Sequence, residues 1–164
     1  MSMSATKKLD VIGKSRRRVD GRVKVTGALR YADDMKLPRM LHMKLLRSPH
    51  PHALIEAIDI GRAQAYPGVH LVLTGKDFPV PFGMMPVSQD EYPLAPEHVR
   101  YVGDPVAAVV AKDEQTAAEA LALIEVSYKA LPTIATPEEA LAQPAARIHD
   151  YTDSGNIHRN QALE

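Results

Sequence analysis

Two histidines stand two residues apart, at His50 and His52, close to Ser48. In an extended backbone the side chains of residues i and i+2 share a side, so both imidazoles could face a metal ion. A zinc site needs further ligands, and no suitably spaced third ligand accompanies this pair. Ser48 has neither the nucleophile-elbow context nor an evident oxyanion hole that a hydrolase triad requires. We therefore interpret the cluster as a turn or an interface, and an independent hydrolase or metal enzyme is the last of three hypotheses.

Acidic pairs occur at 33–34 and 90–91, where two adjacent carboxylates could hold a cation or share a proton. Such pairs in loops are far more often simply hydrated. Gly103, before Asp104 and Pro105, could mark a close backbone approach to a ligand or form a simple turn. No G-x-G-x-x-G pattern is present. By residue chemistry alone, nothing in the chain assembles a catalytic centre.

The elements that would position these residues centre on 98–131, where the pattern predicts a β-α-β unit. The apolar run 106–111 is typical of a strand covered on both faces. Residues 113–124 predict a helix whose stripe of Ala117, Leu121 and Ile124 packs on a sheet. Residues 126–130 alternate apolar and polar side chains, which predicts a half-buried strand that ends at Pro132.

Shorter elements precede and follow this unit. Turn signals and alternation predict further strands, with short helical pieces between them. A threonine followed by a proline predicts the start of a last helix at Thr136-Pro137. The expected elements are an extended piece at 22–25, strands at 40–47, 54–60 and 69–74, helical turns at 61–66, and a helix to about Ala142.

Residues 76–96 contain five prolines, which predicts a long irregular excursion over the surface. This loop carries both phenylalanines of the chain, Phe78 and Phe82, together with Met84, Met85 and Leu94. It is too apolar for a loop that only meets water, so we expect something to cover it.

Composition limits the function further. The 164 residues carry 20 Lys+Arg and 20 Asp+Glu, so the net charge near zero gives no electrostatic case for nucleic acid or for an anionic membrane. The absence of cysteine excludes disulfides, thiolate metal sites and iron–sulfur ligation within this chain. Residues 1–20 form a basic arm without an apolar signal region, and no window is long and apolar enough for a membrane span. We expect a single cytoplasmic domain with tails.

Several ordered motifs resemble one family. The segments are RVDG at 18–21, KVTGA at 24–28, YAD at 31–33, LRSPH at 46–50, PGV at 67–69 and VRYVGDPVAAVVA at 99–111. Together they resemble the N-terminal domain of the molybdenum-binding subunit in the xanthine dehydrogenase/aldehyde oxidase family. Within that family, VPFG at 80–83, DEYPLA at 90–95 and the Gly103-Asp104-Pro105 variant look most similar to the large subunit of 4-hydroxybenzoyl-CoA reductase.

The resemblance implies an α+β fold of the α/β-hammerhead type, with a mixed sheet and a few helices, over residues 21–145. Residues 146–164 would then form an exit segment toward cofactor-binding domains that this chain lacks. The complete enzyme would use a molybdopterin cytosine dinucleotide, with iron–sulfur clusters and FAD on other domains or subunits. We expect no cofactor on this chain alone, and we expect the chain to be inactive by itself.

The resemblance also suggests roles for a few residues. Phe82, Met84 and Met85 are candidates for the wall of a channel that admits an aromatic or heteroaromatic substrate, although they could equally cover the domain's own core or an interface. Gly103 and Asp104 are candidates for the interface with the cofactor-binding domains of the same subunit. The leading hypothesis is a scaffold and substrate-funnel domain that works with iron–sulfur and flavin subunits. The alternative is a stand-alone interaction or assembly module derived from such a domain.

Overall fold

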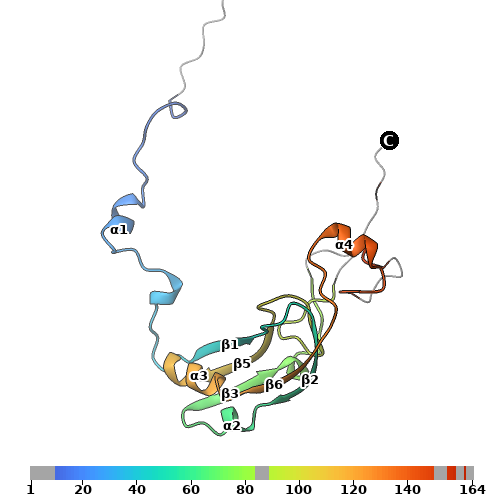
Figure 1. The fold of residues 1–164 in the computed structure, drawn as a ribbon. Helices are drawn as coiled ribbons and strands as arrows, with labels where there is room; N and C mark the ends of the chain where they lie inside the picture. Colours follow the sequence, from blue (N-terminus) through green and yellow to red (C-terminus); the bar gives the residue numbers. More distant parts are fainter. Residues whose placement is uncertain (1–9, 84–88, 150–154, 158–160, 162–164) are drawn as a thin grey trace, which may run out of the picture. The chain divides into compact units, whose positions relative to one another are not determined.

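The computed structural model describes residues 10–83, 89–149, 155–157 and 161 of the chain. The chain divides into two units, residues 1–38 and residues 39–164. Figure 1 shows the ribbon.

The first unit contains a short helix α1, Gly21–Val25, and a 3-10 turn η1, Ala32–Asp34. The prediction of an extended piece at 22–25 is therefore wrong. Local contacts explain the helix: the Thr26 hydroxyl donates to the Arg22 carbonyl at 2.8 Å, and Lys24 pairs with Asp20 at 2.5 Å. No residue of either element is buried.

The second unit is built on two antiparallel three-stranded sheets, which we name sheet A and sheet B. Their strand orders are β1-β5-β3 in sheet A and β4-β2-β6 in sheet B. The strands are β1 His42–Arg47, β2 Ala53–Asp59, β3 Val69–Thr74, β4 His98–Val99, β5 Pro105–Ala111 and β6 Glu125–Ala130. The helices are α2 Gly61–Gln64, α3 Glu114–Leu121 and α4 Pro137–Ala142, with a 3-10 turn η2 at Gly75–Asp77. The predicted α+β class is confirmed, whereas the predicted mixed sheet is wrong, because every strand pair in sheets A and B is antiparallel.

The three elements of the predicted β-α-β unit are present, but its two strands lie in different sheets. β5 is the central strand of sheet A, and five of its seven residues are buried. After α3, β6 pairs antiparallel with β2 in sheet B. The helix thus joins two sheets and does not return to the sheet that it left. Pattern alone predicts the type of each element, whereas pairing depends on partners that are distant in sequence.

Of the three register shifts in these sheets, those in β2 and β5 adjust which side chains face the interior. In β2, pairing with β6 skips Glu56, so Ile55 and Ile58 both pack against a group of buried residues that includes Ala53 and Val99. This explains why Ile55 breaks the alternation of its strand. In β5, pairing with β1 skips Val106, so Val106 and Ala107 both reach the core.

The core has two connected clusters. The first joins Val72, Ala107 and Val109 of sheet A to Ala120 of α3 and to Ile124. The second joins four small buried residues, Ala53, Ala95, Val99 and Val106. Small side chains let the two sheets and the helix approach closely.

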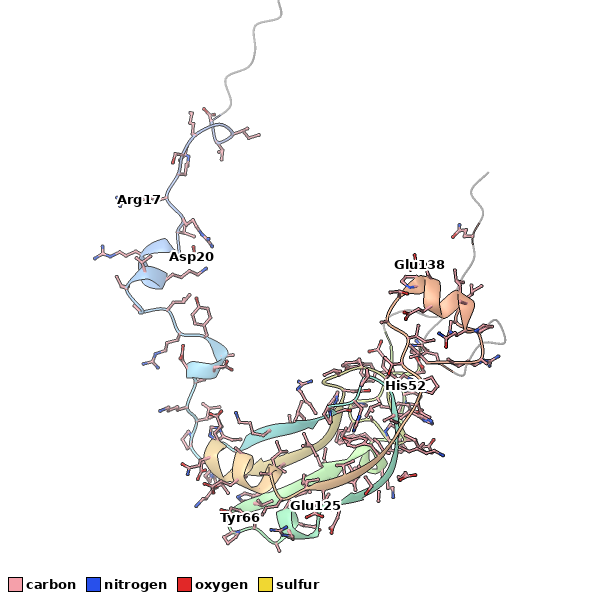
Figure 2. All side chains as sticks on the ribbon, viewed as in Figure 1. Arg17, Asp20, His52, Tyr66, Glu125 and Glu138 are labelled. Carbon is pink, nitrogen blue, oxygen red and sulfur yellow. The ribbon has the colours of Figure 1, made fainter. Side chains whose placement is uncertain are left out.

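Helix α3 begins and ends with local hydrogen bonds. The Asp113 carboxylate accepts from the Thr116 N–H at 2.7 Å and caps the first turn. The helix ends at Leu121, three residues before the predicted end, because Leu123 and Ile124 bond to carbonyls only three residues back. Figure 2 shows Tyr66 and Glu125 near α2, whereas His52 lies at the far end of β2.

Candidate functional site

A pocket of about 360 Å³ lies where the chain enters β5. It is formed by three parts of the chain: the loop residues 82 and 90–95, the turn 98–105 and the segment 148–149. Its lining is mixed, with aromatic, apolar and charged side chains. The residues are Phe82, Asp90, Glu91, Tyr92, Pro93, Ala95, His98, Arg100, Tyr101, Asp104, Pro105, Ile148 and His149.

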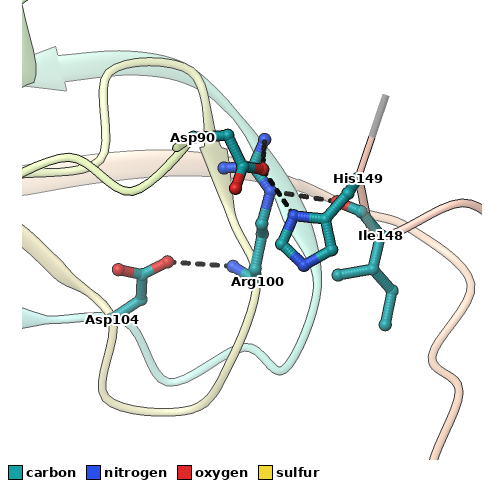
Figure 3. A network of polar contacts seen from close by, with 5 residues as sticks. All are labelled: Asp90, Arg100, Asp104, Ile148 and His149. Carbon is teal, nitrogen blue, oxygen red and sulfur yellow. Dashed lines mark hydrogen bonds and ion pairs between the residues drawn. The ribbon is translucent and has the colours of Figure 1, made fainter. Parts of the chain in front are cut away.

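Arg100 connects all three stretches (Figure 3). Its Nε donates to the backbone carbonyl of Ile148 at 2.9 Å, and its terminal nitrogen lies 3.9 Å from Asp90 Oδ2. The same Asp90 oxygen lies 2.5 Å from Nδ1 of His149. The side chains of Arg100 and Asp90 are 21% and 20% exposed, so this network is only partly screened by water. One arginine and one aspartate thereby hold the segment 148–149 against the pocket.

The side chain of Asp104 stabilises the turn 100–104. It is buried, and its carboxylate accepts from the Arg100 backbone N–H at 2.9 Å. Burial raises the pKa of this carboxyl, although the hydrogen bond from the Arg100 N–H and the nearby guanidinium oppose the rise. The pKa of the neighbouring Tyr101 is also raised, first by burial and then by the charge of Asp104. Ionisation is thus disfavoured at both groups.

Gly103 occupies the left-handed backbone region, with φ +95°, and no atom lies within 4 Å of the position that a Cβ would take. The turn conformation itself therefore requires glycine. This favours the interpretation as a turn over a close approach to a ligand. Backbone bonds anchor the turn to the end of β1, since Gly103 N–H donates to the Ser48 carbonyl and Ser48 N–H to the Asp104 carbonyl. Arg47 adds a side-chain bond to the Gly103 carbonyl at 2.8 Å.

The predicted site residues are partly brought together. Phe82 and Asp104 line the same pocket, and Gly103 lies next to it in the turn. Phe82 is held by a pair of backbone hydrogen bonds with Glu91, and its side chain is half-exposed. Met84 and Met85 lie outside the described residues. The roles of these residues as channel wall or interface stay predictions.

Sequence reasoning missed Arg100 and His149, and it interpreted Asp90 as one of a hydrated pair. In the structure Asp90 contacts both of these residues. The only signal was the acidic pair at 90–91 within an apolar loop. Its basic partners lie 10 and 59 residues away, a separation that no local pattern reveals.

The histidine cluster has structural contacts. The Ser48 hydroxyl, which is buried, accepts from the His50 N–H at 3.0 Å and so closes a local turn. The His50 ring packs on Tyr128 at 4.9 Å between centroids, and Nδ1 of His52 lies 2.9 Å from the Pro132 carbonyl. These contacts agree with the interpretation as a turn.

The described ranges contain no group of three or more His, Asp or Glu side chains placed to hold a metal ion. The pocket offers carboxylates, imidazoles and aromatic faces, but no activated nucleophile beside a base. Its chemistry suits binding and positioning better than bond making. In the same described ranges, no helix has the length and apolar character needed to cross a bilayer.

Comparison with known proteins places this geometry in context. The family described as "Aldehyde oxidase and xanthine dehydrogenase, a/b hammerhead domain" matches residues 26–132. A probable xanthine dehydrogenase chain of Bacillus subtilis (strain 168) is 46% identical over 147 residues, which are 88% of this chain and 19% of that protein. The xanthine dehydrogenase molybdenum-binding subunit of Escherichia coli O157:H7 is 39% identical over 89% of this chain and 20% of its own length.

Among solved structures, the quinoline 2-oxidoreductase of Pseudomonas putida 86 superposes with a TM-score of 0.74 at 39% identity. That match covers 87% of this chain and 19% of the other. The chain therefore spans only a small part of the length of the relatives that it matches.

Proposed function

The chain belongs to the family of the aldehyde oxidase and xanthine dehydrogenase a/b hammerhead domain, and we propose that it is the scaffold and substrate-funnel domain of a molybdenum hydroxylase-type oxidoreductase. In this proposal the domain does no bond chemistry by itself. It shapes the path to a cofactor held by other domains of the same subunit. Iron–sulfur and flavin subunits would carry electrons away, and the enzyme would work in the cytoplasm.

One observation carries the proposal: the fold brings the loop residue Phe82 and the turn residue Asp104 to the same pocket. One phenylalanine, two tyrosines and two prolines offer a flat apolar wall. Asp104 and Arg100 add polar groups that can orient the ring of a bound substrate. An aromatic or heteroaromatic substrate suits such a lining. In its most specific form, the proposal is that the enzyme resembles 4-hydroxybenzoyl-CoA reductase, because residues 80–83 and 90–95 are similar to the large subunit of that enzyme.

The pocket does not suit the cofactor itself. A molybdopterin cytosine dinucleotide carries a pyrophosphate, which favours backbone N–H cradles and cationic side chains. The pocket instead places three acidic side chains, Asp90, Glu91 and the buried Asp104, around a single guanidinium, and burial disfavours ionisation at Asp104. Repulsion between carboxylates and phosphates disfavours the cofactor here. In this proposal the cofactor binds to other domains of the subunit and not to this pocket.

The first experiment identifies the native polypeptide. An antibody raised against residues 39–149 is used to purify the polypeptide from its source, and its mass and molybdenum content are measured. A polypeptide several times longer with stoichiometric molybdenum is expected. A molybdenum-free polypeptide of 164 residues would contradict the proposal and favour a stand-alone interaction or assembly module.

The second experiment tests the funnel. In the native enzyme, Phe82→Ala, Met84→Ala and Met85→Ala should change kcat/KM for bulky aromatic substrates relative to small ones, by about tenfold for a lost wall contact. Phe78→Ala is the matched control, because Phe78 is similarly exposed in the same loop but does not line the pocket. Equal effects of Phe78→Ala and Phe82→Ala on substrate preference would argue for simple packing.

A further inference from the structure

One face of sheet A, which we call the outer face, carries only apolar side chains in two complete rows across its strands. Residues that lie opposite each other in a sheet share a face, so the registers define the rows. The first row is Met43, Val110 and Leu71, and the second is Leu45, Ala108 and Leu73.

The other face of the same sheet is the interior. The residues that alternate with the outer rows, Ala107, Val109 and Val72, belong to the first core cluster together with Ala120 of α3. Since successive side chains of a strand point to opposite faces, the outer face is turned away from this cluster. Figure 1 shows α3 beside β1 and β5.

The outer face is open at both edges of its first row, whereas in the second row Leu45 and Leu73 are half-buried and Ala108 between them is buried. Met43 is 58% exposed and Leu71 is 47% exposed, and Leu41 just before β1 is 46% exposed. An antiparallel sheet that meets water on one face normally carries polar residues there. The two rows contain none. A contiguous apolar patch of this kind marks a contact surface.

A polar side chain bounds the outer face at one end. Arg47 follows Leu45 on the same side of β1, and its guanidinium donates to the Gly103 carbonyl at 2.8 Å. An apolar centre beside a polar boundary is the usual anatomy of a protein interface. The pocket lies just beyond this boundary, since Pro105, which pairs with Arg47, lines it.

We propose that the outer face is the surface on which this domain docks against the remainder of a molybdenum hydroxylase large subunit, through an apolar surface of the same polypeptide. This inference rests on the proposed function. In the solved quinoline 2-oxidoreductase, the match covers only 19% of the chain. The rest of such a polypeptide therefore offers ample surface that could cover the outer face.

The small size of the outer face favours a tethered partner over a second copy of the chain. A stable interface between separate proteins uses about 20–30 residues on each side, whereas the two rows supply six. A tethered partner has a high effective concentration, so a smaller contact suffices. The patch would then be covered at every protein concentration.

Hydroxyl-radical labelling with mass spectrometry tests this placement. Labelling of Met43 and Leu71 is measured in the native polypeptide, in the same polypeptide unfolded in urea, and in the 164-residue chain. A covered outer face predicts that labelling of both residues falls, between the unfolded and the native polypeptide, to the level of the fully buried Val109. In the 164-residue chain the same residues should label readily, in line with their exposure.

Each alternative outcome has its own meaning. Strong labelling of Met43 and Leu71 in a long, molybdenum-containing polypeptide overturns the inference and leaves the proposed function standing. Protection that appears in the 164-residue chain and grows with its concentration shows that a second copy of the chain covers the outer face. This outcome also overturns the inference. A native polypeptide of only 164 residues without molybdenum overturns the proposed function first.

Variants provide a second readout. Met43→Lys and Leu71→Lys should leave the circular dichroism of the 164-residue chain unchanged, since both side chains meet water there. In the native polypeptide, each should raise the rate of limited proteolysis between this domain and the remainder about tenfold, because a lysine resists burial. Leu141→Lys, on α4 and 64% exposed, is the matched control. Equal proteolysis rates for all three variants would contradict docking through the outer face.

Discussion

The carboxylate of Asp104 accepts a hydrogen bond from the backbone N–H of Arg100 at 2.9 Å and closes the turn between β4 and β5. The guanidinium of the same Arg100 holds the carbonyl of Ile148. The buried Asp104 therefore fixes the backbone of Arg100. The side chain of Arg100 in turn fixes Ile148, which lies 48 positions later in the chain. Turn geometry and the wall of the pocket are coupled through one residue.

Asp104→Asn should change how stability depends on pH. Because burial raises the pKa of Asp104 above the usual 3.8, the folded chain holds this proton more tightly than the unfolded chain. The resulting stabilisation is present below the unfolded value and is lost as pH rises through the folded pKa. Asparagine stays neutral, so the variant should gain stability relative to the wild type as pH rises from about 4 to about 7. Urea unfolding over this range measures the difference.

Asp104→Ala is the companion variant. It leaves the Arg100 N–H without its acceptor and should lower the free energy of unfolding by about 1–3 kcal/mol. Parallel pH profiles of wild type and Asp104→Asn would show that this carboxyl does not titrate abnormally.

Gly103→Ala should lower the free energy of unfolding by about 1–2 kcal/mol, because alanine is strained at a φ of +95°. Nothing lies within 4 Å of the new Cβ, so the loss reports backbone strain alone. Gly61→Ala, at the first residue of α2 and outside the left-handed region, should cost less, because the new Cβ would meet only Asp59 Oδ1 at 3.3 Å, the end of a side chain that can move. Chemical denaturation compares the two, and equal losses would contradict the strain explanation.

Gly75→Ala should be more damaging, for a different reason. A Cβ at Gly75 would lie 2.4 Å from Cα of Pro96 and 2.5 Å from the carbonyl oxygen of Ala95. Both contacts are with backbone, which cannot rotate away, so a loss of about 3 kcal/mol is expected. The Ala95 N–H bonds to the Pro105 carbonyl, and a shift should therefore also alter backbone amide exchange at the pocket. An unchanged denaturation midpoint would refute the predicted clash.

Asp113→Asn should change the pH profile in the opposite direction to Asp104→Asn. Hydrogen bonding from Thr116 lowers the pKa of Asp113, so the ionised form stabilises the folded chain. That stabilisation is present above the unfolded value of 3.8 and is lost as pH falls through the lower folded pKa. Asparagine keeps a capping oxygen without titrating, so the variant should lose less stability on acidification. Thermal unfolding at acidic and neutral pH checks this, and an equally acid-sensitive variant would contradict it.

The sequence by itself determined elements whose cause is local. The apolar run 106–111 predicts a buried strand, and Asp113 and Thr136-Pro137 predict where α3 and α4 begin. Each of these depends on side-chain periodicity or on a hydrogen bond three residues away, which a linear pattern contains. The ordered motifs also determined the family.

Only the tertiary structure decided how these elements combine. It separated β5 and β6 into two sheets, placed Arg100 between Asp90 and Ile148, and left the outer face of sheet A open. Strand pairing and ion pairs join residues far apart in sequence, and their free energies depend on which partners the whole fold brings within reach. The same alternation of residues therefore predicts each strand but not its neighbours.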